Sequence, residues 1–90
     1  MNNHINLSIK MFGAFRKYYP GTLEITVPFG SSAQCIKSAI GIAIHEANPT
    51  FCDDELISKS ALANQQRVLN DDEQITEHSS LAILPPVCGG

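Results

Sequence analysis

The sequence is short of positive charge. Its 90 residues include six lysines and arginines against nine aspartates and glutamates, giving a net charge of −3 at pH 7. Nucleic-acid binding depends on neutralising backbone phosphates with lysine and arginine, so this balance argues against a nucleic-acid partner. A protein partner with a basic surface is the more natural expectation.

Long apolar runs are also missing. No run of 18 apolar residues occurs, and the first residues lack the charged leader and apolar stretch of a secretion signal. These features predict a soluble cytoplasmic protein with no membrane partner. A chain of 90 residues allows one domain with one modest core, because it buries about 60% or more of its unfolded surface.

Motifs for catalysis and nucleotide binding are absent from the sequence. It contains no P-loop, no Gly-x-Gly-x-x-Gly and no Gly-x-Ser-x-Gly, so we do not expect the chain to bind ATP or to act as a hydrolase. Cys35, Cys52 and Cys88 include no Cys-x-x-Cys pair, which suits a reducing compartment better than a disulfide framework. The three histidines are equally scattered, and no metal site is expected.

Hydrophobic periodicity predicts a strand hairpin at the start of the chain. Every second residue is apolar from Ile5 to Met11, and the alternation returns from Leu23 to Val27. This period is typical of half-buried strands. Residues 13–21 between them hold two glycines and a proline, so a loop is predicted there.

A helix is predicted after the second strand. Ser31 and Gln34 have the spacing of a capping box, and apolar residues recur at helical spacing from Ile36 to Ala47. Pro49 should end the helix. Gly41 in its middle suggests a close approach to the sheet.

The remaining elements are shorter. Residues 50–55 carry either a second helix start or a solvated acidic loop, and residues 61–63 and 68–69 read as short neighbouring strands separated by a turn. Residues 70–74 are predicted to form a polar loop. Residues 81–84, four apolar side chains in a row, predict a central strand covered on both faces. If the first and last strands are neighbours they run parallel, which predicts a mixed sheet with a helix across one face.

The C-terminal residues are the most distinctive part of the sequence. Pro85 and Pro86 fix φ and cannot continue a sheet ladder, so a stiff segment is predicted to leave the domain here. Gly89 and Gly90 carry no Cβ, so their backbone fits a narrow channel and leaves the carboxylate uncrowded. The chemistry is therefore expected at the carboxylate of Gly90.

Leu84-Pro85-Pro86-Val87-Cys88-Gly89-Gly90 resembles the C-terminus of the small, sulfur-carrier subunits of molybdopterin synthase, a ubiquitin-like family. Phe12-Gly13-Ala14-Phe15-Arg16 resembles the segment after that family's first strand, and Ala61-Leu62-Ala63-Asn64-Gln65 its third strand and turn. The resemblance implies an α+β fold: a ubiquitin-like β-grasp domain over residues 1–84, with a mixed sheet of four to five strands and one main helix across it. Residues 85–90 would form an extended tail.

The resemblance also implies a function. A partner related to ubiquitin-activating enzymes would use ATP and magnesium to adenylate Gly90, and sulfur from a donor protein would displace AMP to give a thiocarboxylate. The tail would then insert into the large subunit of molybdopterin synthase, in a heterotetramer. There it would donate sulfur to cyclic pyranopterin monophosphate, forming the dithiolene of the molybdenum cofactor. The chain would be a non-catalytic subunit of a sulfurtransferase complex and would bind no cofactor itself.

Within the tail, the resemblance implies that Gly90 carries the sulfur and Gly89 gives clearance in the channel. Pro85, Pro86 and Val87 would position the tail in its partner.

Four further residues have open roles. Cys88 stands where the family usually has Ser, Thr or Ala, and it is either tolerated as a small residue or takes part in thiol exchange. Phe12, Phe15 and Arg16 are candidates for a partner surface. The alternatives are core or loop packing for the two phenylalanines and an exposed ion pair for Arg16.

Three other functions remain as hypotheses. A sulfur carrier for thiamine, thiolated tRNA or cysteine synthesis would differ only in the recipient. A ubiquitin-like modifier would join Gly90 to a lysine through an amide, which predicts covalent high-mass adducts. A passive β-grasp interaction module would keep its function when Gly89 and Gly90 are deleted.

Overall fold

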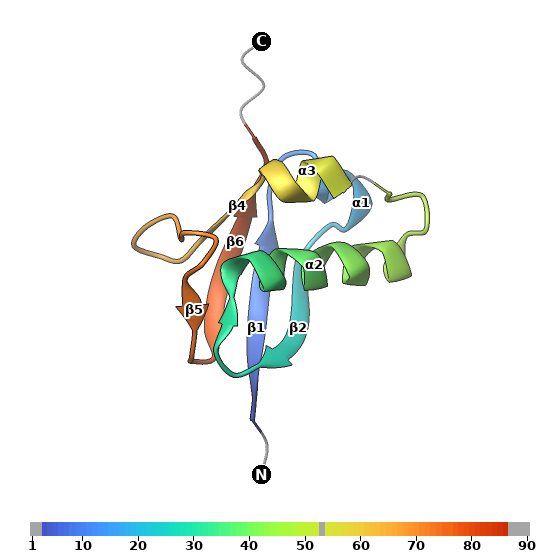
Figure 1. The fold of residues 1–90 in the computed structure, drawn as a ribbon. Helices are drawn as coiled ribbons and strands as arrows, with labels where there is room; N and C mark the ends of the chain where they lie inside the picture. Colours follow the sequence, from blue (N-terminus) through green and yellow to red (C-terminus); the bar gives the residue numbers. More distant parts are fainter. Residues whose placement is uncertain (1–2, 53, 87–90) are drawn as a thin grey trace.

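Residues 3–52 and 54–86 are described by a computed structural model. They form a four-stranded sheet with one main helix lying across one of its faces (Figure 1). None of the helices in these two ranges is long and apolar enough to cross a membrane. In chain order the elements are β1 (His4–Met11), α1 (Phe15–Tyr18), β2 (Thr22–Pro28), β3 (Ser31–Ser32), α2 (Ala33–Ala47), α3 (Asp54–Lys59), β4 (Ala61–Ala63), β5 (Gln74–Ile75) and β6 (Ser79–Leu84).

The two central strands come from opposite ends of the sequence. The strand order is β2-β1-β6-β4, with β1 antiparallel to β2 and parallel to β6, and β6 antiparallel to β4. The parallel ladder runs from Leu7 opposite Ser79 to Met11 opposite Ile83. A parallel pair needs a long crossover connection, and α2 lies within it. The predicted mixed sheet with parallel first and last strands is confirmed.

The core lies between the sheet and α2. Every second residue of β1 from Ile5 to Met11 is buried, while exposed or half-buried polar residues occupy the other face. This alternation follows from the period of a strand, which points successive side chains to opposite faces. The buried apolar residues that α2 adds to the same core are Ala33, Ile36, Ile40 and Ile44.

The last strand is covered on one face only. Leu81 and Ile83 are buried in the core, whereas Ala82 and Leu84 on the other face are half-buried. The expectation that β6 is covered on both faces is therefore wrong for the outer face.

Helix α2 begins one residue later than its capping pattern predicts. Ser31 pairs with Ile75 of β5, and Ser32 is the N-cap, with its Oγ accepting a hydrogen bond from the Cys35 N–H at 3.2 Å. A serine at this position satisfies one of the free N–H groups of the first turn. The capping box of Ser31 and Gln34 is thus corrected: the Ser31 hydroxyl donates a hydrogen bond to the Pro28 carbonyl oxygen at 2.7 Å instead of capping the helix.

The acidic segment after α2 is a helix. Asp54 and Glu55 lie in the first turn of α3, where negative charge is favoured by the helix dipole. Helix α3, not the sheet, approaches Gly41: a Cβ on Gly41 would lie 3.2 Å from Cγ1 of Ile57. The prediction that α2 approaches the sheet closely at Gly41 is therefore wrong, because the close neighbour is α3.

Three short elements, α1, β3 and β5, have no counterpart in the sequence-based predictions. Helix α1 occupies part of the expected loop 13–21, and β5 includes the end of the expected polar loop 70–74. Strand β5 makes only two residue pairs, both with β3. Elements this short depend on tertiary contacts that periodicity does not reveal.

Lys37 is a buried cation that joins three segments. Its Nζ donates hydrogen bonds to the carbonyl oxygens of Ser58 at 3.3 Å and Ser60 at 3.0 Å, at the end of α3, and lies 3.0 Å from Oδ1 of Asp71. The Lys37 side chain is only 5% exposed, whereas Asp71 is 63% exposed. Buried ammonium groups are tolerated when they are paired and hydrogen-bonded, as this one is.

Replacing Lys37 by Met should lower the free energy of unfolding by about 1–3 kcal/mol, because the apolar stem is kept while the Ser60 carbonyl loses its donor. The matched control is Lys59→Met, since Lys59 is 62% exposed and, within residues 3–52 and 54–86, pairs with Glu55 alone. That change should be nearly neutral. Urea unfolding of both variants measures the difference, and equal stabilities would contradict the structural role of Lys37.

Arg67 and Glu73 form an exposed ion pair across the connection from β4 to β5. The hydrogen bond from Arg67 lowers the pKa of Glu73 below its ordinary value. Stability gained this way is present above the pKa of an unfolded glutamate, about 4.3, and is lost as pH falls through the lower folded-state pKa.

The stability difference between the wild type and Glu73→Gln should therefore be present at pH 7 and disappear in acid. Since the pair is exposed, added salt should also reduce it. Thermal unfolding from pH 7 downward measures the difference, with Glu77→Gln as the control because Glu77 has no ion pair among the described residues. A difference that grows as pH falls would contradict this assignment.

Candidate functional site

The site starts where β6 leaves the sheet. β6 runs parallel to β1, and its C-terminal end lies at the edge of the domain next to α3 and the turn before α1 (Figure 1). Pro85 and Pro86 follow it and are both half-buried. Val87, Cys88, Gly89 and Gly90 lie outside the described residues, so the extended tail over residues 85–90 stays a prediction.

Pro85 packs on Gly13, in the turn between β1 and α1. Gly13 has φ +57°, in the left-handed region that favours glycine. A Cβ built on Gly13 would lie 2.6 Å from Cγ of Pro85, so the proline ring occupies the space that a side chain would need. The base of the C-terminal segment is therefore held against the turn after the first strand.

The two phenylalanines beside this turn have different roles. Phe15 is completely buried, and its ring centroid lies 6.4 Å from that of Phe51. Phe15 is therefore removed from the candidate partner surface. It belongs to the core, because α1 turns its side chain inward. Phe12 is 42% exposed. Arg16 is exposed and has no ion pair within residues 3–52 and 54–86, so both remain candidates for a partner surface.

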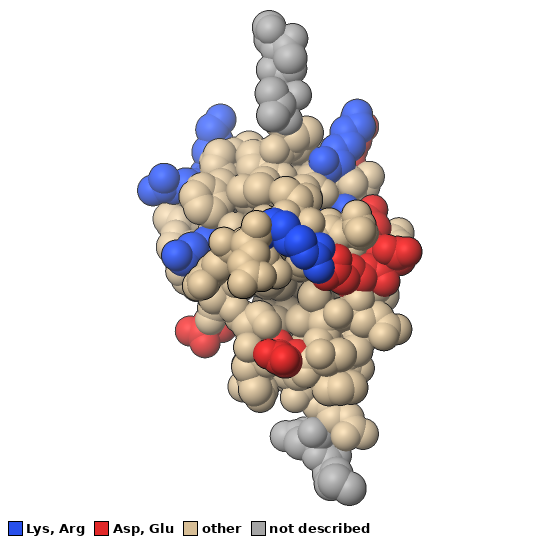
Figure 2. Space-filling view, turned by 90° about the vertical axis from the view of Figure 1, so that its left-hand side faces the viewer, with Lys and Arg blue, Asp and Glu red and all other residues tan. Residues whose placement is uncertain are grey.

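Positive charge gathers at this end of the molecule. Lys10, Arg16 and Lys17 are exposed and belong to β1 and α1, on either side of Gly13. In the described part of the chain none of these three has an ion-pair partner. In Figure 2 the blue side chains lie in the upper half, towards the end where β6 leaves, and most of the red ones lie lower or to the right. The net charge of −3 therefore does not describe the surface around the C-terminal segment, and the basic partner surface expected from that charge does not suit this end of the molecule.

The outer face of the sheet next to this point carries small and apolar side chains on β4 and β6. Ala61 and Ala63 of β4 flank Leu84 and Ala82 of β6, and all four side chains are half-buried. Val68, which bridges to Ala63, is 56% exposed. Small side chains on a pleated surface allow another protein to lie close to it.

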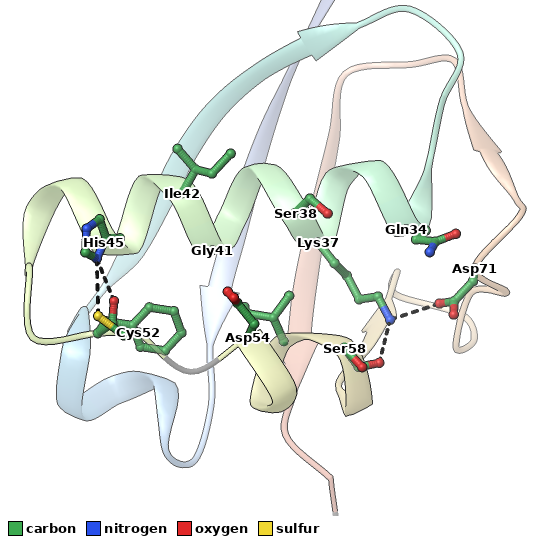
Figure 3. A pocket seen from close by; sticks show the side chains of 12 residues that line it. Gln34, Lys37, Ser38, Gly41, Ile42, His45, Cys52, Asp54, Ser58 and Asp71 are labelled. Carbon is green, nitrogen blue, oxygen red and sulfur yellow. Dashed lines mark hydrogen bonds and ion pairs between the residues drawn. The ribbon is translucent and has the colours of Figure 1, made fainter.

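A groove of about 620 Å³ lies between α2 and α3 (Figure 3). Gly41, Phe51 and Ile57 give it an apolar character, and the ion pair between Lys37 and Asp71 lies at one end. The residues that line this groove include none of those around Gly13 and Pro85. It is therefore a separate feature from the site at the end of β6.

The other end of the groove holds His45 and Cys52, whose Nδ1 and Sγ are 3.9 Å apart. The Nδ1 of His45 lies 2.7 Å from the carbonyl oxygen of Phe51, which can only accept, so Nδ1 carries the proton. His45 therefore cannot take a proton from Cys52 through this atom, and the pair is not arranged as a nucleophile with its base. No group of three or more metal-ligating side chains occurs among the described residues.

No family model matches the sequence, and a search of curated proteins finds no match. Solved structures do match. SAMP1 from Haloferax volcanii has a TM-score of 0.67 at 22% identity, over 94% of this chain and 99% of that one. A putative molybdopterin converting factor, subunit 1, from Pyrococcus furiosus has 0.64 at 19%, over 92% and 99%. Caldiarchaeum subterraneum ubiquitin has 0.62 at 15%, over 97% and 99%.

These similarities confirm the predicted fold. The chain has the ubiquitin-like β-grasp fold, with a mixed sheet of four strands and a helix across it. Identities below a quarter carry no information about activity by themselves. The function is therefore argued from the residues at the end of β6.

Gly13 is the site residue that the sequence-based predictions missed, since they treated it as one of two loop glycines. A signal was present in the sequence. Once the first and last strands are aligned in parallel, Gly13 and Pro85 fall at equivalent distances beyond Met11 and Ile83. A glycine opposite a proline, where two strands separate, indicates close contact between their backbones.

Phe15→Ala should lower the free energy of unfolding by about 3–5 kcal/mol, because it leaves a cavity under α1. Phe12→Ala, the matched control three residues away, should change it by about 1 kcal/mol or less, because its ring is partly in water already. Guanidinium unfolding of both variants, and of Phe15→Leu if the alanine variant does not fold, measures these effects. Equal effects at the two positions would contradict the separation of core from surface.

Proposed function

We propose that this chain is a ubiquitin-like sulfur carrier that holds sulfur as a thiocarboxylate on Gly90, and that it is the small subunit of molybdopterin synthase. The observation that carries the proposal is the segment Leu84–Gly90, in which a proline pair and a glycine pair directly follow a central strand of a β-grasp domain. Similarity in fold to a protein described as a putative molybdopterin converting factor subunit supports it.

The chemistry begins with activation of a carboxylate. A free carboxylate is a poor acyl donor because its leaving group would be oxide. An adenylyltransferase related to ubiquitin-activating enzymes joins the Gly90 carboxylate to AMP, using ATP with magnesium and releasing pyrophosphate. A sulfur nucleophile on a donor protein then attacks the carbonyl carbon: the C–S bond forms, the C–O bond to AMP breaks, and AMP leaves. Where the donor is a persulfide, a thiol reductant cleaves the remaining S–S bond and frees the thiocarboxylate.

In that chemistry this chain presents the Gly90 carboxylate to its partners and does not catalyse the reaction. Gly89 and Gly90 give clearance in a narrow channel, and Pro85 and Pro86 stiffen the base of the segment, which reduces the entropy lost on binding. Val87 positions the segment further along. Acid and base steps, and the phosphate of the pterin substrate, belong to the large subunit.

The surface around the segment determines which partner it fits. Lys10, Arg16 and Lys17 are exposed and have no ion-pair partner in the part of the chain that the structure describes. They are complementary to an acidic surface, and long-range attraction of this kind raises association rates. The outer face around Ala82 and Leu84 provides half-buried apolar side chains next to the same segment. In molybdopterin synthase, this combined surface would dock on the large subunit. The complex would be a heterotetramer in the cytoplasm.

A protein modifier is the second candidate function. The fold resembles a ubiquitin with a TM-score of 0.62 and the putative molybdopterin converting factor subunit with 0.64, so fold similarity does not separate the two. Both functions activate Gly90 in the same way. They differ in the nucleophile that displaces AMP, which is a sulfur atom in one and a lysine amine of another protein in the other.

Incubation with the adenylyltransferase, ATP and a sulfur donor should replace one oxygen of the Gly90 carboxylate by sulfur. Intact-mass analysis detects the change and fragmentation maps it to Gly90; the unreacted mass also tests whether Gly90 is the terminal residue of the mature chain. A variant lacking Gly89 and Gly90 is the control and should gain no sulfur. Covalent adducts of high mass in place of the exchange would favour the modifier. If neither the thiocarboxylate nor the adducts form, both functions are contradicted.

A further inference from the structure

We propose that Gly13 is a positioning residue for the C-terminal segment, because it is the surface on which Pro85 packs and this contact sets the direction in which the chain leaves the sheet. Its importance for activity rests on the proposed function, in which another protein receives the segment. The contact itself rests on geometry alone and can be tested without that function.

The contact follows from the parallel ladder of β1 and β6. The last pair of the ladder is Met11 opposite Ile83, and two residues further along each strand lie Gly13 and Pro85. Pro85 has no N–H group with which to continue the ladder. The two strands therefore separate at the point where a glycine faces a proline ring.

A side chain on Gly13 would displace Pro85. A Cβ at this position would lie 2.6 Å from Cγ and 3.5 Å from Cδ of Pro85, and the first distance is far below the usual separation of carbon atoms. The ring of Pro85 is closed on its own backbone, so it cannot swing aside like the end of a long side chain. Relief requires movement of the backbone at Pro85, and the fixed φ of Pro86 passes that movement along the chain.

Gly13 cannot easily move away in response. Met11 before it and Phe15 after it are both buried in the core, at 5% and 0% exposure. The carbonyl oxygen of Gly13 accepts a hydrogen bond from the Arg16 N–H at 3.1 Å, at the start of α1. The turn is therefore fixed on both sides, and Pro85 is the part of the contact that must yield.

The chain supplies its own control for backbone strain. Gly21 has φ +101° and also favours glycine, but a Cβ there would meet nothing within 4 Å. Alanine at Gly21 therefore introduces left-handed strain alone. Alanine at Gly13 introduces the strain together with the displacement of Pro85.

Direction is measured first, independently of activity. One-bond Cα–Hα residual dipolar couplings of Pro86, in a weakly aligned sample, report its orientation relative to the domain. They should change in Gly13→Ala and stay at the wild-type values in Gly21→Ala. In a Pro85→Ala background, where the ring is absent, Gly13→Ala should have little further effect. Unchanged Pro86 couplings in Gly13→Ala would overturn the proposal. So would an equal change on introducing Gly13→Ala into the wild type and into the Pro85→Ala variant.

Activity is measured second, with the adenylyltransferase and ATP, as pyrophosphate exchange dependent on Gly90. Gly13→Ala should lower kcat/KM on the order of tenfold, since small misplacements of reacting groups have effects of this size. Gly21→Ala should react like the wild type, and in the Pro85→Ala background Gly13→Ala should again add little. Equal rates for the two alanine variants would overturn the role in activity.

The outcomes separate the two proposals. If the wild type is not adenylated at all, the proposed function fails, and the Pro86 couplings still decide whether Gly13 directs the segment. If Gly13→Ala does not fold while Gly21→Ala does, the single variant Pro85→Ala takes its place. It should also change the Pro86 couplings, and couplings at the wild-type values would then count against the contact.

Discussion

The parallel pairing of β1 with β6 is the constraint on which the rest of the structure depends. It joins the first and last strands at the centre of the sheet and buries Ile9 and Ile83 between the sheet and α2. It also brings Gly13, from the first quarter of the sequence, against Pro85. Both the core and the candidate site are therefore products of one strand pair.

Most of this architecture could be predicted from the sequence, because the signals are local and strong. The alternation from Ile5 to Met11, the helical spacing from Ile36 to Ala47 and the apolar run from Leu81 to Leu84 each correspond to an observed element. The parallel pairing of the first and last strands was predicted only for the case that they are neighbours, and the resemblance to a β-grasp family supported that case. The base of the C-terminal segment was found from its proline pair.

The features that were missed depend on contacts between distant segments. Phe15 was left open between a partner surface and core packing, because the loop-like segment 13–21 has no periodicity to decide, and α1 places it in the core against Phe51. Gly41 was assigned to the wrong neighbour, since periodicity cannot say whether the sheet or α3 lies opposite. Lys37 gave no sequence signal for burial, because only the folded chain supplies the carbonyl groups around it.

The contact between Gly13 and Pro85 also makes the orientation of the C-terminal segment depend on completion of the sheet. Pairing between remote parts of a chain is among the slower events of folding. Pro85 cannot pack on Gly13 until β1 and β6 have paired. If Gly13 directs the segment as proposed, a chain whose sheet is incomplete lacks the contact that orients Pro85. A receiving enzyme that requires one angle would thus select finished molecules and ignore unfinished ones, without any separate step of quality control.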